Sequence, residues 1–343
     1  DPSLRILALP LEGCGKMFLG CGAEVLGLRR PMPSGGFIHH NLAGFLADIF
    51  FGGWIQTTWK HISTLRQLRG KVDLVIAIGD MIPAFASSLV SAPLIFVGIN
   101  KSDYYHFRGY SYMGFEISYL RRFAQKVFTR DEITAERLRR AGVKAEYVGN
   151  PMMDLISSNG TSPGKSPGVL TIGFLPGTRP GDIPINLKDF EQITTSLNQA
   201  SGHLRKYDFL LALPVHHPRG TVPRLFQSLP FSKVITESDI IVGLSGTGNE
   251  QAAGAGKPVV AFPSRGSQYT TRFARAQQQL LGNALALCPR DPQHVVKKIL
   301  DILGDPVERE HMGRVGKERM GSIGAIPTMA KAVNNTIHAK NID

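Results

Sequence analysis

Short, wholly apolar runs alternate with helix-forming stretches along the chain, and this alternation restricts the fold most. In the first half we expect strands at LRILALP (4–10), VDLVIAIGD (72–80), APLIFVGIN (92–100) and AEYVGNP (145–151). Helices are expected over 115–127 and 130–143, the second capped by Thr129 or Asp131 and ended by Gly142. Strands that are apolar throughout and separated by helices predict a parallel sheet covered on both faces.

The same alternation begins again after a polar break. The stretch SSNGTSPGKSPG (157–168) has the composition of a linker. Beyond it we expect strands at 169–177, 207–215, 238–245, 257–263 and 284–288, and helices over roughly 186–201, 248–255, 270–282, 292–303 and 306–320. The predicted fold class is α/β, with two doubly wound, Rossmann-like domains whose ligands bind at the strand carboxyl ends, facing a cleft between the domains.

The domain boundaries follow from this pattern. A chain of 343 residues is long for one core, so two domains are expected. We place the first domain at 1–150, a linker at 151–168 and the second domain at 169–325. The tail, 326–343, is expected to cross back to the first domain or to join a partner chain in a homodimer.

The charge balance predicts an anionic partner. The 39 basic and 27 acidic residues give a net charge of +12, which suits nucleic acid, an anionic membrane or phosphorylated substrates. The charges are scattered and form no recognised nucleic-acid module, which argues against nucleic acid. The three cysteines form neither a metal-ligand spacing nor a disulfide framework, and no signal peptide or 18-residue apolar run is visible. We therefore expect a cytoplasmic protein.

One segment departs from a plain α/β pattern. Residues 35–71 are rich in aromatic and aliphatic side chains and then become basic at Lys60, Arg66, Arg69 and Lys71. Either this is a core helix with a basic end, or it is an interfacial helix that rests on an anionic bilayer. The two tryptophans favour the second interpretation. Its membrane-facing residues would then be Phe45, Phe50, Phe51, Trp54 and Trp59.

Two glycine loops in the second half have the chemistry of phosphate sites. In FLPGTRPGD (174–182), Gly177 lets backbone N–H groups approach an anion, and Thr178 and Arg179 add a hydroxyl donor and a charge. Gly246, Thr247 and Gly248 follow an apolar run and open a helix, whose N-terminus attracts pyrophosphate. Neither loop has a dinucleotide or Walker spacing. A Pro-Gly turn with a surface arginine remains the plain alternative for the first loop.

Two polar residues near these loops suit a sugar. Glu250, in the first helical turn after the second loop, would accept hydrogen bonds from ribose hydroxyls, although the helix dipole alone also favours a carboxylate there. Gln268, in SRGSQY (264–269), follows the next strand and can both donate to and accept from sugar hydroxyls. By itself it is an ordinary polar loop residue.

Three stretches in the same order resemble lipid-A-disaccharide synthase: VGNPMMD (148–154), FLPGTRPGD (174–182) and SGTGNEQAAGAGKPVVAFP (245–263). The chain is still more similar to the uncharacterised relatives of that enzyme, in MPSGGF (32–37), KSDYY (101–105) and FARAQQQLLG (273–282). The second half also looks like the transferase that adds N-acetylglucosamine to lipid-linked muramyl peptide. These are GT-B glycosyltransferases of glycolipid biosynthesis, which use a UDP-sugar and a lipid-linked acceptor without a metal.

The resemblance implies a role for each matched residue. Gly177, Thr178 and Arg179 would contact the phosphates or uridine of the donor, and Ser245, Gly246, Thr247 and Gly248 its pyrophosphate. Glu250 would bind the ribose, with Asn249 and Gln268 toward the donor sugar. The expected reaction inverts the sugar and needs one base, for which Asp80 at the end of 72–80 is the candidate; a simple strand-end cap is the alternative. No metal or cofactor is expected, since basic groups and a helix N-terminus would stabilise the departing UDP.

The chain also departs from this pattern. The family begins with a further strand and a Gly-rich loop, so we expect that the first domain here lacks its first strand and loop. Two other functions therefore stay open. A UDP-N-acetylglucosamine 2-epimerase would need paired acid and base groups, for which Asp80, Glu116 and His216 are the candidates. A degenerate GT-B scaffold would bind nucleotide or membrane without catalysis.

Overall fold

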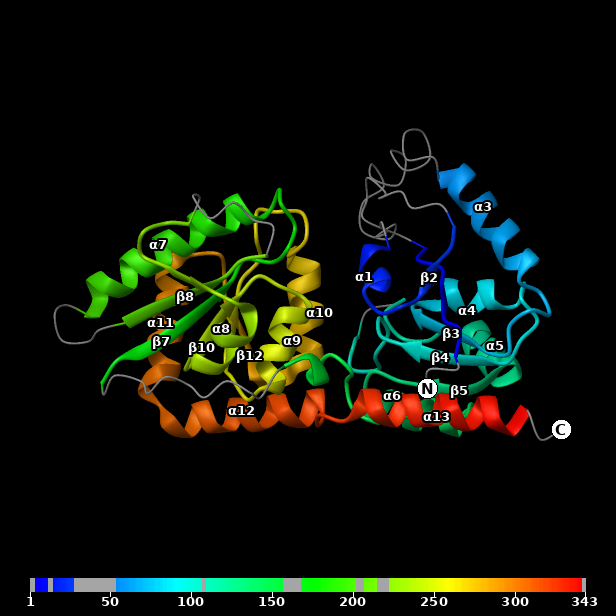
Figure 1. Ribbon diagram of the computed structural model, residues 1–343. Helices are drawn as coiled ribbons and strands as arrows, with labels where there is room; N and C mark the ends of the chain where they lie inside the picture. The colour runs from blue at the N-terminus through cyan, green and yellow to red at the C-terminus, as the bar shows by residue number, and fades with distance from the viewer. Residues whose placement is uncertain are drawn as a thin grey trace.

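The computed structural model describes residues 4–11, 15–27, 54–106, 109–156, 168–201, 207–214 and 222–340. Within these ranges the chain forms two parallel-sheet domains that lie side by side (Figure 1). Phe45, Phe50, Phe51 and His216, and residues 157–167 of the predicted linker, lie outside the described residues. No helix in the described ranges is long and apolar enough to cross a bilayer.

The first domain is built on a parallel sheet with the strand order β3-β4-β5-β6. Its strands are β3 (Val75–Gly79), β4 (Leu94–Gly98), β5 (Ala124–Phe128) and β6 (Ala145–Glu146). Its helices are α3 (Trp54–Gln67), α4 (Met81–Ser87), α5 (Gly114–Phe123) and α6 (Glu132–Arg140), the last capped by the Asp131 carboxylate. A separate parallel pair, β1 (Leu7–Ala8) and β2 (Glu24–Val25), flanks the short helix α1 (Lys16–Leu19).

One element of the first domain differs from the sequence prediction. The helix expected over 115–127 ends at Phe123, and the chain continues at once into β5, between β4 and β6. Ala124, Val127 and Phe128 are buried, but Lys126 interrupts the apolar pattern and pairs with Glu146 on β6 at 2.5 Å. This charge on a sheet position hid the strand, because the segment lacks the continuous apolar run of its neighbours.

The second domain has a parallel sheet in the order β12-β11-β10-β7-β8-β9. Its strands are β7 (Leu170–Leu175), β8 (Tyr207–Ala212), β9 (Gln227–Leu229), β10 (Ile240–Gly243), β11 (Val259–Ala261) and β12 (Leu285–Leu287). Its helices are α7 (Ile183–Ser201), α8 (Phe231–Glu237), α9 (Thr247–Gly254), α10 (Thr271–Leu281), α11 (Pro292–Gly304) and α12 (Pro306–Met320), with a 3-10 turn η3 (Gly282–Ala284).

The order of these strands fixes where a ligand can enter. The chain builds outward from β7 through β8 to β9, and then returns to build β10, β11 and β12 on the other side of β7. The strand order therefore reverses between β7 and β10. In open parallel sheets this switch point leaves a crevice at the strand carboxyl ends, where ligands bind.

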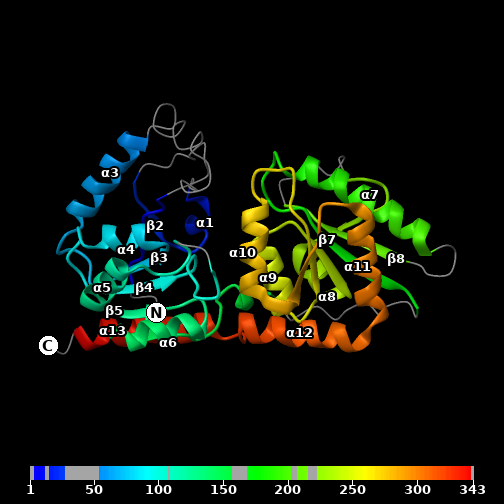
Figure 2. The same ribbon diagram turned by 180° about the vertical axis from the view of Figure 1, so that it is seen from behind.

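The last helix returns to the first domain. α12 packs on α9 and η3, and α13 (Ala325–Lys340) then runs along the first domain in both views (Figures 1 and 2). Met329, Ala332 and Val333 of α13 pack against a small buried cluster on β4 and β5. Asp154, in the turn η1 (Met153–Leu155), accepts hydrogen bonds from the N–H groups of Gly324 and Ile326 at 2.5 and 2.6 Å.

A tyrosine-rich segment of the first domain also contacts the second. The guanidinium of Arg319 lies 3.7 Å from the ring centroid of Tyr104, and the His106 N–H donates to the side chain of Gln279 at 2.9 Å. Tyr104 and Tyr105 pack against the core of the second domain. The KSDYY stretch thus forms part of the contact between the domains.

Candidate functional site

Three loops of the second domain meet at the switch point. Residues 176–182 follow β7, residues 244–246 follow β10, and residues 262–270 follow β11. Gly177, in the first of these loops, has a φ of +83°. A Cβ atom added there would lie 3.1 Å from the Leu244 carbonyl oxygen of the second loop and 3.4 Å from Gln268 Oε1 of the third. Only a glycine accepts both this backbone angle and this close approach without strain. Both predicted phosphate loops and the SRGSQY loop therefore lie in contact.

Buried polar side chains hold these loops together. The two carboxylate oxygens of Asp182 accept from the backbone N–H groups of Ser267 and Gln268 at 2.9 and 2.8 Å. Asn186 donates to the Pro176 carbonyl at 2.8 Å and also bonds to the Ser264 hydroxyl. Asp182 lies within the FLPGTRPGD motif, yet its partners are more than eighty residues away, so no local pattern indicates this contact.

The glycine loop before α9 is held by hydrogen bonds to the buried side-chain amide of Gln277, which is itself bonded to that of Asn249. Gln277 donates to the carbonyl oxygens of Ser245 and Gly246 at 3.2 and 2.7 Å, and it accepts from Asn249 and from the Tyr269 hydroxyl. Burial raises the pKa of Tyr269, so its hydroxyl stays a neutral donor. Gln277 belongs to the FARAQQQLLG stretch, which here acquires a structural role.

Asn249 occupies a different environment from the one expected. The resemblance directs it toward the donor sugar, but its side chain is fully buried. Its amide nitrogen donates to the Gly243 carbonyl, the Tyr269 hydroxyl and Gln277 Oε1. These contacts make Asn249 a support for the loop, because a buried amide with three acceptors has no donor left for a sugar.

The remaining loop residues are placed where a ligand can reach them. Thr178 and Thr247 are exposed, and Arg179, Ser245, Gly246 and Gln268 are half-buried. Arg179 donates to the Ser267 hydroxyl at 3.4 Å, across two of the loops. The backbone at the start of α9 adds the positive end of a helix dipole. Together these groups can bind a diphosphate.

Glu250, the expected ribose ligand, forms an ion pair with the first domain. It lies in the first turn of α9, and its Oε2 accepts from Arg130 Nη2 at 2.5 Å. Arg130 was not among the predicted site residues. It lies two residues after the end of β5, and because the sequence predicts a helix over 115–127, it does not indicate a strand end there.

Asp80, the candidate base, lies at the carboxyl end of β3 in the first sheet. Its carboxylate accepts from the Ile82 N–H at 2.8 Å and so caps α4. Within the described ranges, no hydrogen bond or ion pair joins Asp80 to the three loops of the second domain. A strand-end cap accounts for the contacts that this side chain makes.

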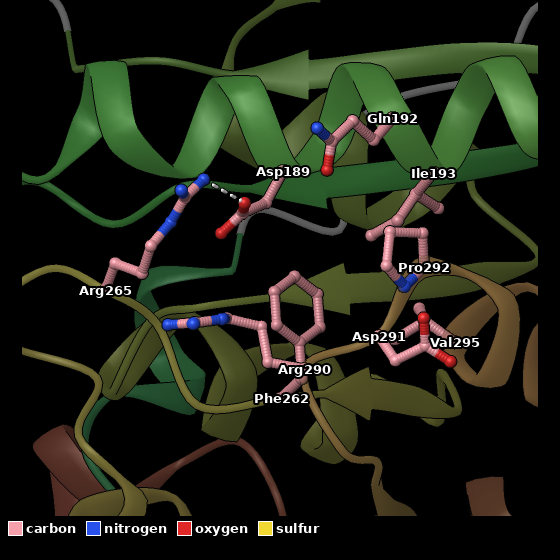
Figure 3. A pocket seen from close by; sticks show the side chains of 9 residues that line it. All are labelled: Asp189, Gln192, Ile193, Phe262, Arg265, Arg290, Asp291, Pro292 and Val295. Atoms are coloured by element: carbon pink, nitrogen blue, oxygen red, sulfur yellow. Dashed lines mark hydrogen bonds and ion pairs between the residues drawn. The ribbon is translucent and has the colours of Figure 1, made fainter.

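A cavity of about 150 Å³ opens beside the third loop, between α7 and the start of α11 (Figure 3). Arg265 points across it to Asp189 of α7 and pairs with it at 2.6 Å, over the buried ring of Phe262. This ion pair ties the loop that carries Gln268 to α7. Arg265 therefore serves to anchor the loop.

The comparisons with known proteins agree at the level of the fold. No family model and no curated protein sequence matches the chain. The structure of the calicheamicin glycosyltransferase CalG4 matches with a TM-score of 0.62 and 14% identity, over 97% of this chain and 91% of CalG4. A putative UDP-N-acetylglucosamine 2-epimerase from Listeria monocytogenes matches with a TM-score of 0.57 and 15% identity, over 84% and 81% of the two chains.

A third structure, S. aureus MnaA with UDP, matches with a TM-score of 0.56 and 17% identity, over 83% of this chain and 82% of that one. Identities this low establish the fold alone. They confirm the predicted fold class, and they do not single out lipid-A-disaccharide synthase. The chain is an α/β protein of two Rossmann-like domains, in the GT-B arrangement of these glycosyltransferases and epimerases.

Proposed function

We propose that this protein is a glycosyltransferase that moves a sugar from a UDP-sugar donor to a lipid or lipid-linked acceptor at a membrane surface. The observation that carries the proposal is the meeting of three loops at Gly177, at the switch point of the second sheet. They bring Arg179 and the N-terminus of α9 to the switch point, and the first turn of α9 carries the Glu250 carboxylate. A nucleoside diphosphate sugar presents the matching groups: a diphosphate and a ribose.

The donor would bind along these loops. Thr178, Arg179 and the backbone from Ser245 to Gly248 would hold the diphosphate, Glu250 would accept from the ribose hydroxyls, and Gln268 would face the donor sugar. We propose that no metal takes part, because Arg179 and the start of α9 supply positive charge where the UDP leaving group forms.

The chemical step would be a direct displacement. The acceptor hydroxyl oxygen attacks the anomeric carbon of the donor sugar, its proton passes to the Asp80 carboxylate, and UDP departs with the electrons of the broken C–O bond. A single displacement, with attack from the side opposite the departing UDP, inverts the configuration at the anomeric carbon. Asp80 is proposed as this base because it ends β3 on the carboxyl edge of the first sheet.

The outer face of α3 supports attachment to a membrane. Thr57, His61 and Leu65 are buried and hold one side of the helix on the domain. On the opposite side Trp59 is 66% exposed, next to the exposed Lys60. An exposed tryptophan beside cationic side chains is typical of a helix that lies on an anionic bilayer.

A transfer assay tests the proposal. The purified protein is incubated with labelled UDP-sugars and vesicles of extracted membrane lipids, and lipid-bound label is measured. We expect label in the lipid fraction, lost in Asp80→Asn and kept in Asp73→Asn, whose exposed carboxylate lies just before the same strand. Failure of every donor to label lipid would contradict transfer, and UDP binding without any product would indicate a degenerate scaffold.

An epimerase is the second candidate, because the same donor site would hold UDP-N-acetylglucosamine for either reaction. Of its candidate acid and base groups, Glu116 is buried and paired with Lys101 at 2.7 Å, and it also accepts from the Met113 N–H. These contacts leave it poorly placed to exchange a proton with a sugar. Appearance of epimerised UDP-sugar without any acceptor would establish this second candidate.

A further inference from the structure

The two carboxylate oxygens of Glu250 have different surroundings. Oε2 makes the shortest contact with Arg130, at 2.5 Å, whereas no described residue other than Arg130 forms a hydrogen bond or ion pair with Oε1. The Glu250 side chain is 12% exposed, so a part of it still reaches solvent. Arg130 therefore holds Oε2, which leaves Oε1 as the oxygen that can accept from a ligand.

Arg130 is itself held firmly by the first domain. Its Nη1 donates to the Ile99 carbonyl at 2.9 Å and to the Tyr105 hydroxyl at 3.1 Å, so the side chain reaches from the end of β5 back to the end of β4. Burial raises the pKa of Tyr105 to about 12, so this hydroxyl is neutral and accepts the bond. Burial alone would lower the pKa of Arg130, but the Glu250 carboxylate raises it.

Arg130 has no terminal nitrogen left for a ligand, since Nη1 donates to Ile99 and Tyr105 and Nη2 pairs with Glu250. Its contact with Glu250 also depends on how the domains meet. Tyr105 belongs to the segment that rests on the second domain through Tyr104 and His106. The orientation of Glu250 is thus set by a side chain from the other domain.

We infer that Arg130 is a positioning residue of the donor site: it holds Glu250 by one oxygen so that the other accepts from a ribose hydroxyl. This inference rests on the proposed nucleotide-sugar function and adds a requirement to it. Ribose recognition would need the first domain, even though the loops that bind the diphosphate all belong to the second. A carboxylate fixed in advance loses less conformational freedom when the ligand binds, which increases affinity.

Ribose discrimination tests this directly. Titration calorimetry gives the affinities of UDP, 2′-deoxy-UDP and 3′-deoxy-UDP for the wild type and for Arg130→Gln, Arg130→Lys, Glu250→Gln and the Arg130→Gln/Glu250→Gln double variant. We expect the wild type to prefer UDP over the weaker deoxy analogue by about tenfold or more. Arg130→Gln and Glu250→Gln should each reduce this ratio toward one, and Arg130→Lys should restore part of it. The double variant should lose no more than Glu250→Gln alone.

Arg137→Gln is the matched control, because Arg137 also pairs with a carboxylate, Asp103, in the first domain but does not contact Glu250. It should keep the wild-type ratio. Circular dichroism checks each fold; removing one partner of a buried ion pair is destabilising. If Arg130→Gln unfolds, the UDP-to-deoxy-UDP affinity ratios of Arg130→Lys and of the double variant test the inference instead. The double variant leaves no uncompensated charge from this ion pair.

Wild-type preference for UDP that persists in the Arg130 variants would overturn the inference and leave the proposed function intact. A double variant that loses more than Glu250→Gln would also overturn it, since Arg130 would then act by another route. A wild type that binds no UDP would overturn both the inference and the proposed function.

Discussion

Asp182 shows how a single side chain can hold two loops together at the switch point. Each of its carboxylate oxygens accepts a backbone N–H from the loop after β11. Asp182→Asn keeps only one acceptor oxygen and leaves one partly buried N–H without its partner. We expect it to lower the free energy of unfolding by about 1–3 kcal/mol and to weaken UDP binding. Urea denaturation and calorimetry measure the two effects, with the exposed Asp301→Asn as the control. Unchanged UDP affinity in Asp182→Asn would contradict this role.

At the residue scale, the sequence predicted what depends on local chemistry. Gly177, Arg179 and the glycines before α9 were recognisable because strand-end glycines and nearby charges have a local signature. Contacts between distant segments were not recognisable. Arg130 reaches Glu250 from 120 positions earlier in the chain. The side-chain amide of Asn249 is directed into the core, where it donates to Gln277 Oε1. Neither contact has a local pattern.

At the scale of loops and helices, the close approach at Gly177 yields a controlled experiment. Gly177→Ala forces a side chain against Leu244 and Gln268, whereas Gly168, with a nearly equal φ of +84°, has no atom within 4 Å of an added Cβ. Both variants bear the backbone cost of about 1 kcal/mol. Only Gly177→Ala should also weaken UDP binding. Equal UDP affinities in the two variants would show that the loops need not meet there.

The outer face of α3 gives a second prediction at this scale. Lys60→Glu with Arg66→Glu reverses two exposed charges beside Trp59, so we expect co-sedimentation with anionic vesicles to fall severalfold. Binding to neutral vesicles should change little. Lys297→Glu with Lys298→Glu, on exposed positions of α11, is the matched charge reversal. If both double variants lose the same amount of vesicle binding, α3 has no special role.

Element prediction succeeded where the pattern was continuous and failed where it was broken. Helices α10, α11 and α12 lie within one residue of their predicted bounds, because each is a long amphipathic or capped segment. β5 was missed because Lys126 interrupts it, and β9 because Gln227 and Ser228 are exposed on an edge strand. Because β5 was missed, Arg130, two residues after its end, was not considered as a residue at a strand carboxyl end.

At the scale of the whole molecule, the join between domains depends on α13. Asp154 accepts from two backbone N–H groups at the start of this helix. Asp154→Ala removes this cap, and we expect a loss of about 1 kcal/mol in unfolding free energy together with a larger radius of gyration in X-ray scattering. Asp301→Ala, on an exposed position of α11, is the control. An unchanged radius in Asp154→Ala would show that other contacts hold α13.

The fold as a whole was predictable because apolar runs alternate with helical stretches on both sides of a polar break. This pattern is typical of two parallel-sheet α/β domains joined by a linker. The relation between the domains was not, since it depends on Tyr104, Arg130 and α13 meeting partners far away in the chain. Those contacts bring Arg130 of the first domain onto Glu250 of the second. If the proposed function is correct, the donor site therefore needs parts of both domains.

The central claim is that the loops at Gly177 form a UDP-sugar site, and UDP titration by calorimetry tests it most directly. We predict saturable binding by the wild type, weakened about tenfold or more by Glu250→Gln and by Arg179→Ala. Glu318→Gln and Arg314→Ala, on exposed positions of α12, should bind UDP as the wild type does. No binding by the wild type, or wild-type affinity in both Glu250→Gln and Arg179→Ala, would contradict the account.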